Sequence, residues 1–524
     1  MKIGARTRLG SGRRNGWQVL EAQGTQSGDS THKRGSTHPL RGRAWHVLEA
    51  PTGEQPAVDS EAMVGPALPD ESTVHFVLEL ALRIGEVQML SGAGASDVTA
   101  TIIAITKAFG LPHTEVDVIF TSITATCHRG SDESPVTSVR VVRGRSLDYN
   151  RLSETERLVQ RITRGRVSPE QAYSELQRIN TAAHPYPRIV STLAWGGMAG
   201  FITLIVGGSF TTALFAFLIS AVVDRVGRFL NHYSLPFFFQ QVMGGLIATL
   251  SATAVVNIEV VPVDKPSLVA AGAITVLLSG LGTVSAVQDA ITGYNVTAAG
   301  RTMEVVLMSA GLITGVTVGL RIAELFEPQR QLQQASAQTV LDLPIMLAAG
   351  GGAAACFALA SYARLRSILV GSVAGAVGAV TYGALNLLTA SPLEEAAGRV
   401  SQAAANPGLL TGDLILSSAV AATLVGFAGG VMARRLKVTP LVVAVSGITP
   451  LLPGLATYRG LYALVQGQGV TALMAAAAIG LALAAGVVLG KYLAQPVRTG
   501  LGKLERKLAG PRMAGPLDPL RRTG

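Results

Sequence analysis

Charged residues are scarce in this sequence: they make up 15% of its 524 residues, whereas soluble globular chains carry about 25%. The mean hydropathy is correspondingly high, at +0.40. Glycine, by contrast, is abundant at 59 residues, and glycine is more frequent in transmembrane helices than in soluble ones. A single soluble domain also rarely reaches this length. The composition therefore indicates a membrane protein.

Cysteine is nearly absent, with only Cys127 and Cys356, and the sequence has no CxxC pair. This argues against a structural zinc site and against a redox motif. Cys356 lies in an apolar run and is expected to be a small core residue. The motifs HExxH and GxSxG are missing, and the stretch SGAGAS at 91–96 lacks the GK[ST] of a phosphate loop. We therefore predict no catalytic residue, no metal and no cofactor.

The basic residues are spread through tails and loops, although the formal net charge is +10. A nucleic-acid-binding protein would gather them on one face or in one motif. A membrane protein carries extra Lys and Arg in its cytosolic loops, where they fix its orientation. The charge therefore predicts a membrane orientation and no nucleic-acid partner.

The N-terminal stretch 1–71 is rich in Gly, Ser and Arg, and no apolar stretch follows its basic residues as it would in a signal peptide. We expect a disordered basic tail there. The next segment, 72–182, is expected to be a cytosolic α+β domain. Its second helix is expected to begin at a cap on Ser96 or Asp97, and Ile123 is slightly out of step in an otherwise alternating run. The patterns predict helices over 74–89, 96–109, 153–164 and 168–179, and strands within 114–126 and 136–142.

From residue 189 onward the sequence contains about ten apolar runs of the length that spans a bilayer. They group into two predicted membrane halves, 189–326 and 343–493, which precede a basic tail over 494–524. The fourth and ninth runs are interrupted by Gly, Pro and polar residues. The runs lie near 189–207, 208–223, 237–256, 267–288, 303–323, 343–363, 367–389, 409–432, 440–457 and 470–492.

Loop charges predict the orientation of these helices. Placing 72–182 inside puts more Lys and Arg in the inner loops, and it also places the basic C-terminal tail inside. An even number of helices keeps both termini on the same side. The sequence therefore predicts a multi-pass protein of the cytoplasmic (inner) membrane with both termini in the cytosol.

A short internal repeat joins the two interrupted runs. The strings LLSGLGT at 277–283 and LLPGLAT at 451–457 both read LLxGLxT, and they lie five helices apart. The two helices would cross the membrane in opposite directions, so the five-helix halves are predicted to be inverted relative to each other. Inverted repeats with interrupted helices at matching positions indicate a secondary transporter and its substrate site. The alternative is helix packing through small residues.

The same stretches resemble the threonine/serine exporter family over about 72–493. The resemblance implies export of threonine and serine driven by the proton-motive force, hence an amino-acid substrate, protons and the lipid bilayer as partners. It also fits a boundary between the halves near 327–342, because some members are split at their midpoint. Tyr294 and Asn295 are a minor departure from the family pattern. The matching strings are RIG at 83–85, SG at 91–92, SD at 96–97, HTEVD at 113–117, LP at 235–236, FFQ at 238–240, GGLIAT at 244–249, QDAITG at 288–293 with VTA at 296–298 and Arg301, and GITPLLPGL at 447–455 with YRG at 458–460.

We place the candidate substrate site between the fourth and ninth helices. Asp289 is the candidate for the substrate ammonium and for the coupling proton, and Arg459 or the amides freed near Gly454 for the substrate carboxylate. A structural role is equally open for each residue. Asp289 would then be a residue at the cytosolic end of its helix, and Arg459 would anchor its helix at the membrane interface. The candidate substrate-binding residues are Gly280, Thr283, Ser285, Gln288, Asp289, Thr449, Pro450, Pro453, Gly454, Thr457, Tyr458 and Arg459.

Arg301 and Glu304 are predicted to form a structural ion pair at i, i+3, with Arg301 to Asp289 across the loop as the alternative. In the α+β domain, four residues suggest a metal or hydrolase site, although polar residues on a strand surface explain them better: His113, Glu115, Asp117 and His128. A membrane hydrolase and a membrane-bound sensor or scaffold therefore remain as rival functions. The oligomeric state is left open, a homo-oligomer included.

Overall fold

The computed structural model describes residues 70–129, 133–144, 147–257, 266–326, 342–394, 407–436, 438–465, 467 and 470–508. All of them belong to one compact unit, Pro66–Gly524. The predicted N-terminal tail, the boundary between the membrane halves and the end of the C-terminal tail lie almost wholly outside these residues.

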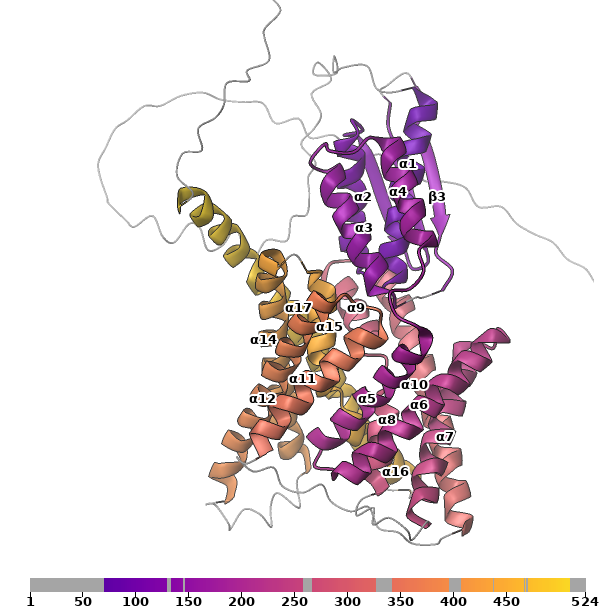
Figure 1. Ribbon diagram of the computed structural model, residues 1–524, viewed down its shortest axis with the longest axis vertical. Coiled ribbons are helices and arrows are strands. Elements are labelled where there is room, and N and C mark those ends of the chain that lie inside the picture. The colour runs from indigo at the N-terminus through magenta and orange to yellow at the C-terminus, as the bar shows by residue number, and fades with distance from the viewer. Residues whose placement is uncertain are drawn as a thin grey trace, which may run out of the picture. The chain divides into compact units, whose positions relative to one another are not determined.

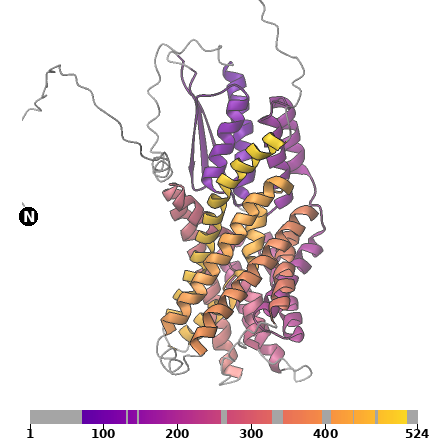
Figure 2. The ribbon, with the colours of Figure 1, turned by 90° about the vertical axis from the view of Figure 1, so that its left-hand side faces the viewer.

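The N-terminal part of the described chain combines four helices with one small sheet (Figures 1 and 2). The sheet is antiparallel in the order β1-β2-β3, and α1 and α2 pack against it. The elements are α1 (Glu71–Leu90), α2 (Ala95–Ala108), β1 (Thr114–Ile119), β2 (Ser122–Cys127), β3 (Val136–Val141), α3 (Tyr149–Ile162) and α4 (Pro169–Thr181).

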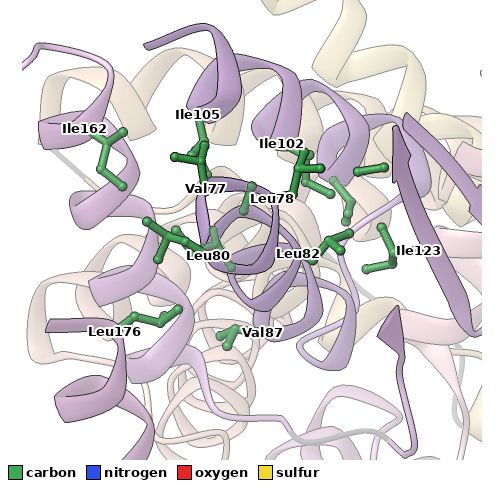
Figure 3. Packing of buried hydrophobic residues seen from close by; sticks show 14 of the residues in the cluster. Val77, Leu78, Leu80, Leu82, Val87, Ile102, Ile105, Ile123, Ile162 and Leu176 are labelled. Atoms are coloured by element: carbon green, nitrogen blue, oxygen red, sulfur yellow. The ribbon is translucent and has the colours of Figure 1, made fainter. Parts of the chain in front are cut away.

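The core of this α+β segment forms around α1. Val77, Leu80 and Ile84 recur at helical spacing and are almost fully buried, with Ile102 of α2 and Ile123 of β2 in the same cluster (Figure 3). Burying an aliphatic side chain of this size contributes about 1.5–3 kcal/mol. The apolar pattern of the sequence therefore determines which face of α1 meets the sheet.

Three details of this segment differ from the sequence prediction. The run at 114–126 is two strands, because Phe120 adopts a φ of 51° and turns the chain into a hairpin that pairs Ile119 with Ser122. That turn is the reason Ile123 is out of step. The cap of α2 is Gly94, so the prediction of Ser96 or Asp97 is wrong. The α3 helix begins at Tyr149, where the Asp148 side chain accepts a hydrogen bond from the Arg151 N–H, and not at 153.

The rest of the described chain is helical. Its elements are α5 (Arg188–Ile205), α6 (Phe210–His232), α7 (Phe237–Asn257), α8 (Pro266–Thr275), α9 (Gly280–Ile291), α10 (Asn295–Phe326), α11 (Leu343–Ala360), α12 (Leu365–Glu394), α14 (Pro407–Leu436), α15 (Pro440–Ile448), the short 3-10 turn η4 (Thr449–Leu451), α16 (Gly454–Val465) and α17 (Thr471–Leu508). The long α17 runs along α14 (Figure 2).

Among the described residues, seven helices are long and apolar enough to cross a membrane, and up to nine if each of two bent pairs is one span. The bent pairs are α8 with α9, at 52°, and α15 with η4 and α16, at 49°. They coincide with the fourth and ninth predicted runs, so the predicted interruptions are confirmed. The second predicted run corresponds to α6, which also carries Asp224, Arg225 and Arg228 and is not among the nine. The count of ten stays a prediction.

The two predicted halves repeat one pattern of helix contacts. In the first half α5 packs on α6, α6 on α7 and α7 on α10. The α8 helix contacts α5, α6 and α7. In the second half α11 packs on α12, α12 on α14 and α14 on α17. The α15 helix contacts α11, α12 and α14. The halves meet where α5 packs on α11 and α8 on α16. This matching pattern supports the predicted repeat.

Candidate functional site

The two interruptions pack directly against each other. The side chain of Leu452 lies so close to Gly280 that a β-carbon there would be 3.0 Å from Leu452 Cδ2. A β-carbon on Gly454 would overlap the Thr275 hydroxyl and lie 2.9 Å from the Ala271 carbonyl oxygen. Each LLxGLxT string therefore lies at a bend, and its glycine leaves room for close contact with the other bent pair. We call this contact the crossing.

Threonine hydroxyls satisfy backbone carbonyls beside the bends. Thr283 donates to the Ser279 carbonyl at 2.8 Å, Thr449 to the Val445 carbonyl at 2.9 Å, and Thr457 to the Pro453 carbonyl at 2.7 Å. In an apolar surrounding an unpaired carbonyl is costly, so these bonds stabilise the bent backbone. Each hydroxyl oxygen keeps acceptor capacity for a ligand.

Arg459 is a half-buried cation one turn and a half into α16. It shares a helix face with Leu455 and Tyr462, which pack against the cluster around α8. Within the described part of the chain it has no hydrogen-bond or ion-pair partner. A partly buried guanidinium without a partner is costly and favours an anionic ligand.

The sequence prediction did not include Gln241 of α7. Its amide donates to the Leu277 carbonyl at the first bend, at 3.3 Å, while its Oε1 is buried with no partner among the described residues. The signal was a glutamine in an otherwise apolar run, between Gln240 and the glycine pair at 244–245. Gln241 adds an acceptor to the first bend.

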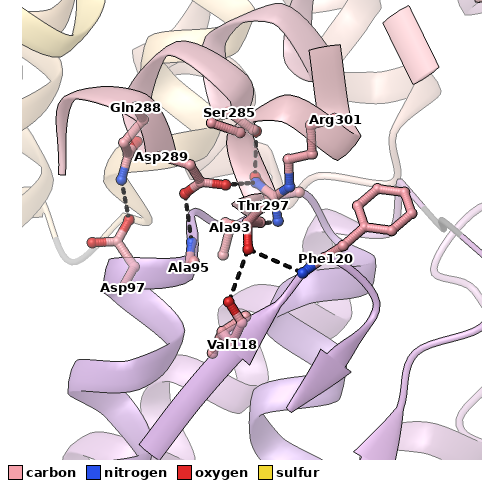
Figure 4. A network of polar contacts seen from close by, with 12 residues as sticks. Ala93, Ala95, Asp97, Val118, Phe120, Ser285, Gln288, Asp289, Thr297 and Arg301 are labelled. Carbon is pink, nitrogen blue, oxygen red and sulfur yellow. Dashed lines mark hydrogen bonds and ion pairs between the residues drawn. The ribbon is translucent and has the colours of Figure 1, made fainter. Parts of the chain in front are cut away.

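Asp289, Ser285 and Gln288 lie elsewhere, where α9 meets the loop between α1 and α2 (Figure 4). The Asp289 carboxylate is fully buried; Arg301 Nη1 lies 2.9 Å from its Oδ2, and the Ala95 N–H donates to its Oδ1 at 2.7 Å. Arg301 also donates to the Ala93 carbonyl at 2.9 Å. Asp289 is therefore an ion-pair partner of Arg301, as in the alternative stated above.

More polar contacts surround this pair. The Ser285 hydroxyl donates to the Gly92 carbonyl, and the Gln288 amide donates to the Asp97 carboxylate. Thr297 of α10 donates to the Val118 carbonyl at 2.8 Å and accepts from the Phe120 N–H at 3.0 Å (Figure 4). Residues 91–97, which are the connection between α1 and α2 and the first turn of α2, are called the 91–97 loop. Their contacts and those of the β1–β2 turn form the polar junction. It joins the α+β segment to α9 and α10.

The structure therefore divides the predicted site residues. Gly280, Thr283 and the residues from Thr449 to Arg459 surround the crossing, whereas Ser285, Gln288 and Asp289 lie at the polar junction. Asp289 follows Gly280 by nine residues and Arg459 follows Gly454 by five, in helices that leave the crossing in opposite directions. At about 1.5 Å per residue they are roughly 20 Å apart along the backbone. One amino acid cannot touch both in this conformation.

A second attachment holds the start of α3 against the helical bundle. Tyr149 and Leu152 are buried in an apolar cluster with Met198 of α5, Phe357 of α11 and Val442 of α15. Next to them, Thr439 at the start of α15 donates to the Glu156 carboxylate at 2.7 Å and contacts the Ser153 hydroxyl at 3.1 Å. We call this contact the α3 anchor.

Replacing Glu156 with glutamine is expected to flatten the dependence of thermal stability on pH. Burial raises the pKa of Glu156 from its ordinary value of 4.5 to about 7, against a lowering by the Thr439 hydrogen bond. A raised folded-state pKa means that the stabilising contribution is present below the unfolded pKa and is lost as the pH rises through about 7. Melting temperatures of both proteins in detergent between pH 5 and pH 8 test this. Equal slopes would contradict it.

The strand residues give no support to a hydrolase. Glu115 and Asp117 project from the exposed face of β1. His128 Nε2 lies 3.9 Å from Glu115 Oε2. In the described ranges, no group of three His, Cys, Asp or Glu side chains is placed to hold a metal ion.

Comparisons with known proteins identify the family of the chain. Two family models of threonine/serine exporters match the chain, one over residues 79–323 and the other over 408–493. The probable threonine/serine exporter of Mycobacterium tuberculosis is 37% identical over 83% of this chain and 79% of its own length. The threonine/serine exporter of Corynebacterium glutamicum is 35% identical over 82% of this chain and 85% of its own length. No solved structure matches the chain significantly. The chain is thus a multi-pass membrane protein that belongs to the threonine/serine exporter family.

Proposed function

We propose that the protein is a secondary transporter that exports threonine and serine across the cytoplasmic membrane, and that the substrate binds at the crossing. The names of its relatives support the substrate class. The observation that carries the site is that two bent helices meet there, and that one of them holds a half-buried arginine without a partner among the described residues. Bent helices at matching positions of two repeats are where secondary transporters bind substrates.

The crossing fits the carboxylate of an amino acid. Both α9 and α16 begin there, and a helix N-terminus presents unpaired N–H groups and partial positive charge. The cap residue of α9, Ser279, makes no side-chain hydrogen bond to these groups. Arg459 adds a full positive charge with two parallel donors. Gln241 Oε1 offers an acceptor for the substrate ammonium or hydroxyl.

We further propose that the α+β segment lies in the cytosol, that both termini are cytosolic, and that ten helices form two inverted halves. The loop charges support the orientation. The repeated contact pattern supports the halves. Export against a gradient needs an energy source, and the proposed one is the proton-motive force. Asp289 is the proposed proton carrier, because protonation of a buried carboxylate would free Arg301 from its partner.

Purified protein in proteoliposomes is expected to show counterflow of labelled threonine that unlabelled serine inhibits. The Arg459→Gln variant should raise the half-saturating threonine concentration about tenfold or more, because it removes a charged hydrogen-bond donor from the carboxylate. Arg321→Gln is the matched control, because Arg321 is 62% exposed and pairs with Glu324 on the surface of α10. Unchanged threonine affinity in the Arg459 variant would contradict this site.

A further inference from the structure

The α+β segment is attached to the helical bundle at two places of different chemistry. The polar junction grips α9 and α10 through Asp289, Arg301 and Thr297. The α3 anchor grips α5, α11 and α15 through Tyr149 and Leu152. Between the two attachments, α1, α2 and α3 touch one another. The α+β segment therefore connects α9 of the first bent pair with α15 of the second.

A bridge of this kind resists relative movement of α9 and α15. A transporter that exposes its site alternately to two sides must move the elements around that site, as packed halves rock against each other. Such movement changes the separation of the polar junction from the α3 anchor. One of the two attachments must therefore open in each transport cycle.

The polar junction is the attachment that opens at lower cost. Water can replace the hydrogen bonds that Ala93, Ala95 and Ser285 make there, so their net contribution is modest. Opening the α3 anchor would instead expose the apolar surfaces of Leu152, Met198 and Phe357, which gain nothing comparable from water. The 91–97 loop also contains Gly92 at a φ of +89°, in the region that favours glycine.

We propose that the 91–97 loop and the β1–β2 turn together form a releasable latch on α9 and α10, and that the start of α3 is the fixed point about which the α+β segment moves. The proposal rests on the proposed transport function. In this proposal substrate at the crossing favours release, and α9 transmits the movement because it runs without interruption from Gly280 at the crossing to Asp289 at the latch.

Two matched cysteine reporters test the latch in the full chain. Cys127→Ala and Cys356→Ala remove the native thiols, and Ser285→Cys or Ser153→Cys then places one thiol at the polar junction or at the α3 anchor. Both serines are buried, with 4% and 7% of their surface exposed. The measurement is the rate of maleimide labelling in detergent, with and without threonine. We expect threonine to accelerate labelling at 285 and to leave 153 protected.

Two substitutions should open the latch without substrate. Arg301→Gln removes the partner of Asp289, and Thr297→Val removes both bonds to the β1–β2 turn without leaving a buried charge. Each should raise labelling at 285 about tenfold or more while 153 stays protected. The second variant keeps the test valid if the first does not fold.

The outcomes separate the two proposals. Equal acceleration at 285 and 153 would overturn the latch, since the whole segment would then leave together. Unchanged labelling at 285 in Arg301→Gln and Thr297→Val would overturn it as well. If both substitutions release 285 while threonine does not, although the same protein shows threonine counterflow, the coupling of substrate to the latch is overturned. If counterflow is absent as well, the proposed function is contradicted.

Discussion

Replacing Gly454 with alanine is expected to abolish threonine transport. The new β-carbon would overlap the Thr275 hydroxyl and lie 2.8 Å from Thr275 Cβ and 2.9 Å from the Ala271 carbonyl. A backbone oxygen cannot rotate away, so α8 and α16 must separate at the crossing. Overpacking of this kind costs about 1–3 kcal/mol, and it also displaces the groups proposed to bind substrate. Threonine counterflow and the melting temperature in detergent measure the two effects.

Gly480→Ala in α17 is the matched control for this substitution. A β-carbon on Gly480 meets nothing within 4 Å. Alanine is favoured over glycine inside a helix by about 0.5–1 kcal/mol, so this variant should transport normally and be as stable or slightly more stable. Wild-type counterflow in Gly454→Ala protein would show that close contact at the crossing is not needed for transport.

Breaking the Asp289–Arg301 pair is expected to destabilise the protein strongly. Arg301→Gln leaves a carboxylate unpaired at a fully buried position, which costs about 3–5 kcal/mol of unfolding free energy. Removing an exposed pair, as in Arg321→Gln, should cost less than about 1 kcal/mol. Thermal unfolding in detergent distinguishes the two. Equal losses of unfolding free energy in the two variants would mean that the buried ion pair stabilises the protein no more than a surface pair does.

Exchanging the two charges should not restore stability. The Ala95 N–H needs an acceptor at position 289, and the Ala93 carbonyl needs a donor at position 301. The double variant Asp289→Arg with Arg301→Asp places a donor at position 289 and an acceptor at position 301. The Ala95 N–H and the Ala93 carbonyl therefore lose their hydrogen-bond partners. Full recovery in the double variant would indicate that charge attraction alone holds the pair.

Asp289→Asn separates the coupling role from the structural one. Asparagine keeps an acceptor for the Ala95 N–H but cannot carry a proton. We expect this variant to lose export driven by a pH gradient while it keeps threonine exchange at zero gradient. A well-folded Asp289→Asn protein whose export still follows the pH gradient would exclude Asp289 as the proton carrier.

Local patterns were enough to predict much of the architecture. Apolar runs give the membrane helices, because a span needs about 20 apolar residues in a row. The glycines of the two LLxGLxT strings, together with Pro450 and Pro453 at the second, give the two bends, because glycine is unfavourable inside a helix and proline removes a backbone donor and clashes with the preceding turn. Ser168 and Gln171 give the start of α4 through a capping box. Each of these signals lies within a few residues of the feature it predicts.

Contacts between distant parts of the chain decided the rest. The α2 helix begins at Ala95, with Gly94 as its cap residue, because Asp289, 194 residues away from Ala95, accepts the first N–H of the helix. No local cap pattern encodes such a partner. The same contact places Asp289 at the polar junction and leaves Arg459 as the unpartnered charge of the crossing among the described residues. Sequence alone identified both charged residues; only the tertiary structure, which determines the partner of each buried charge, separated their roles.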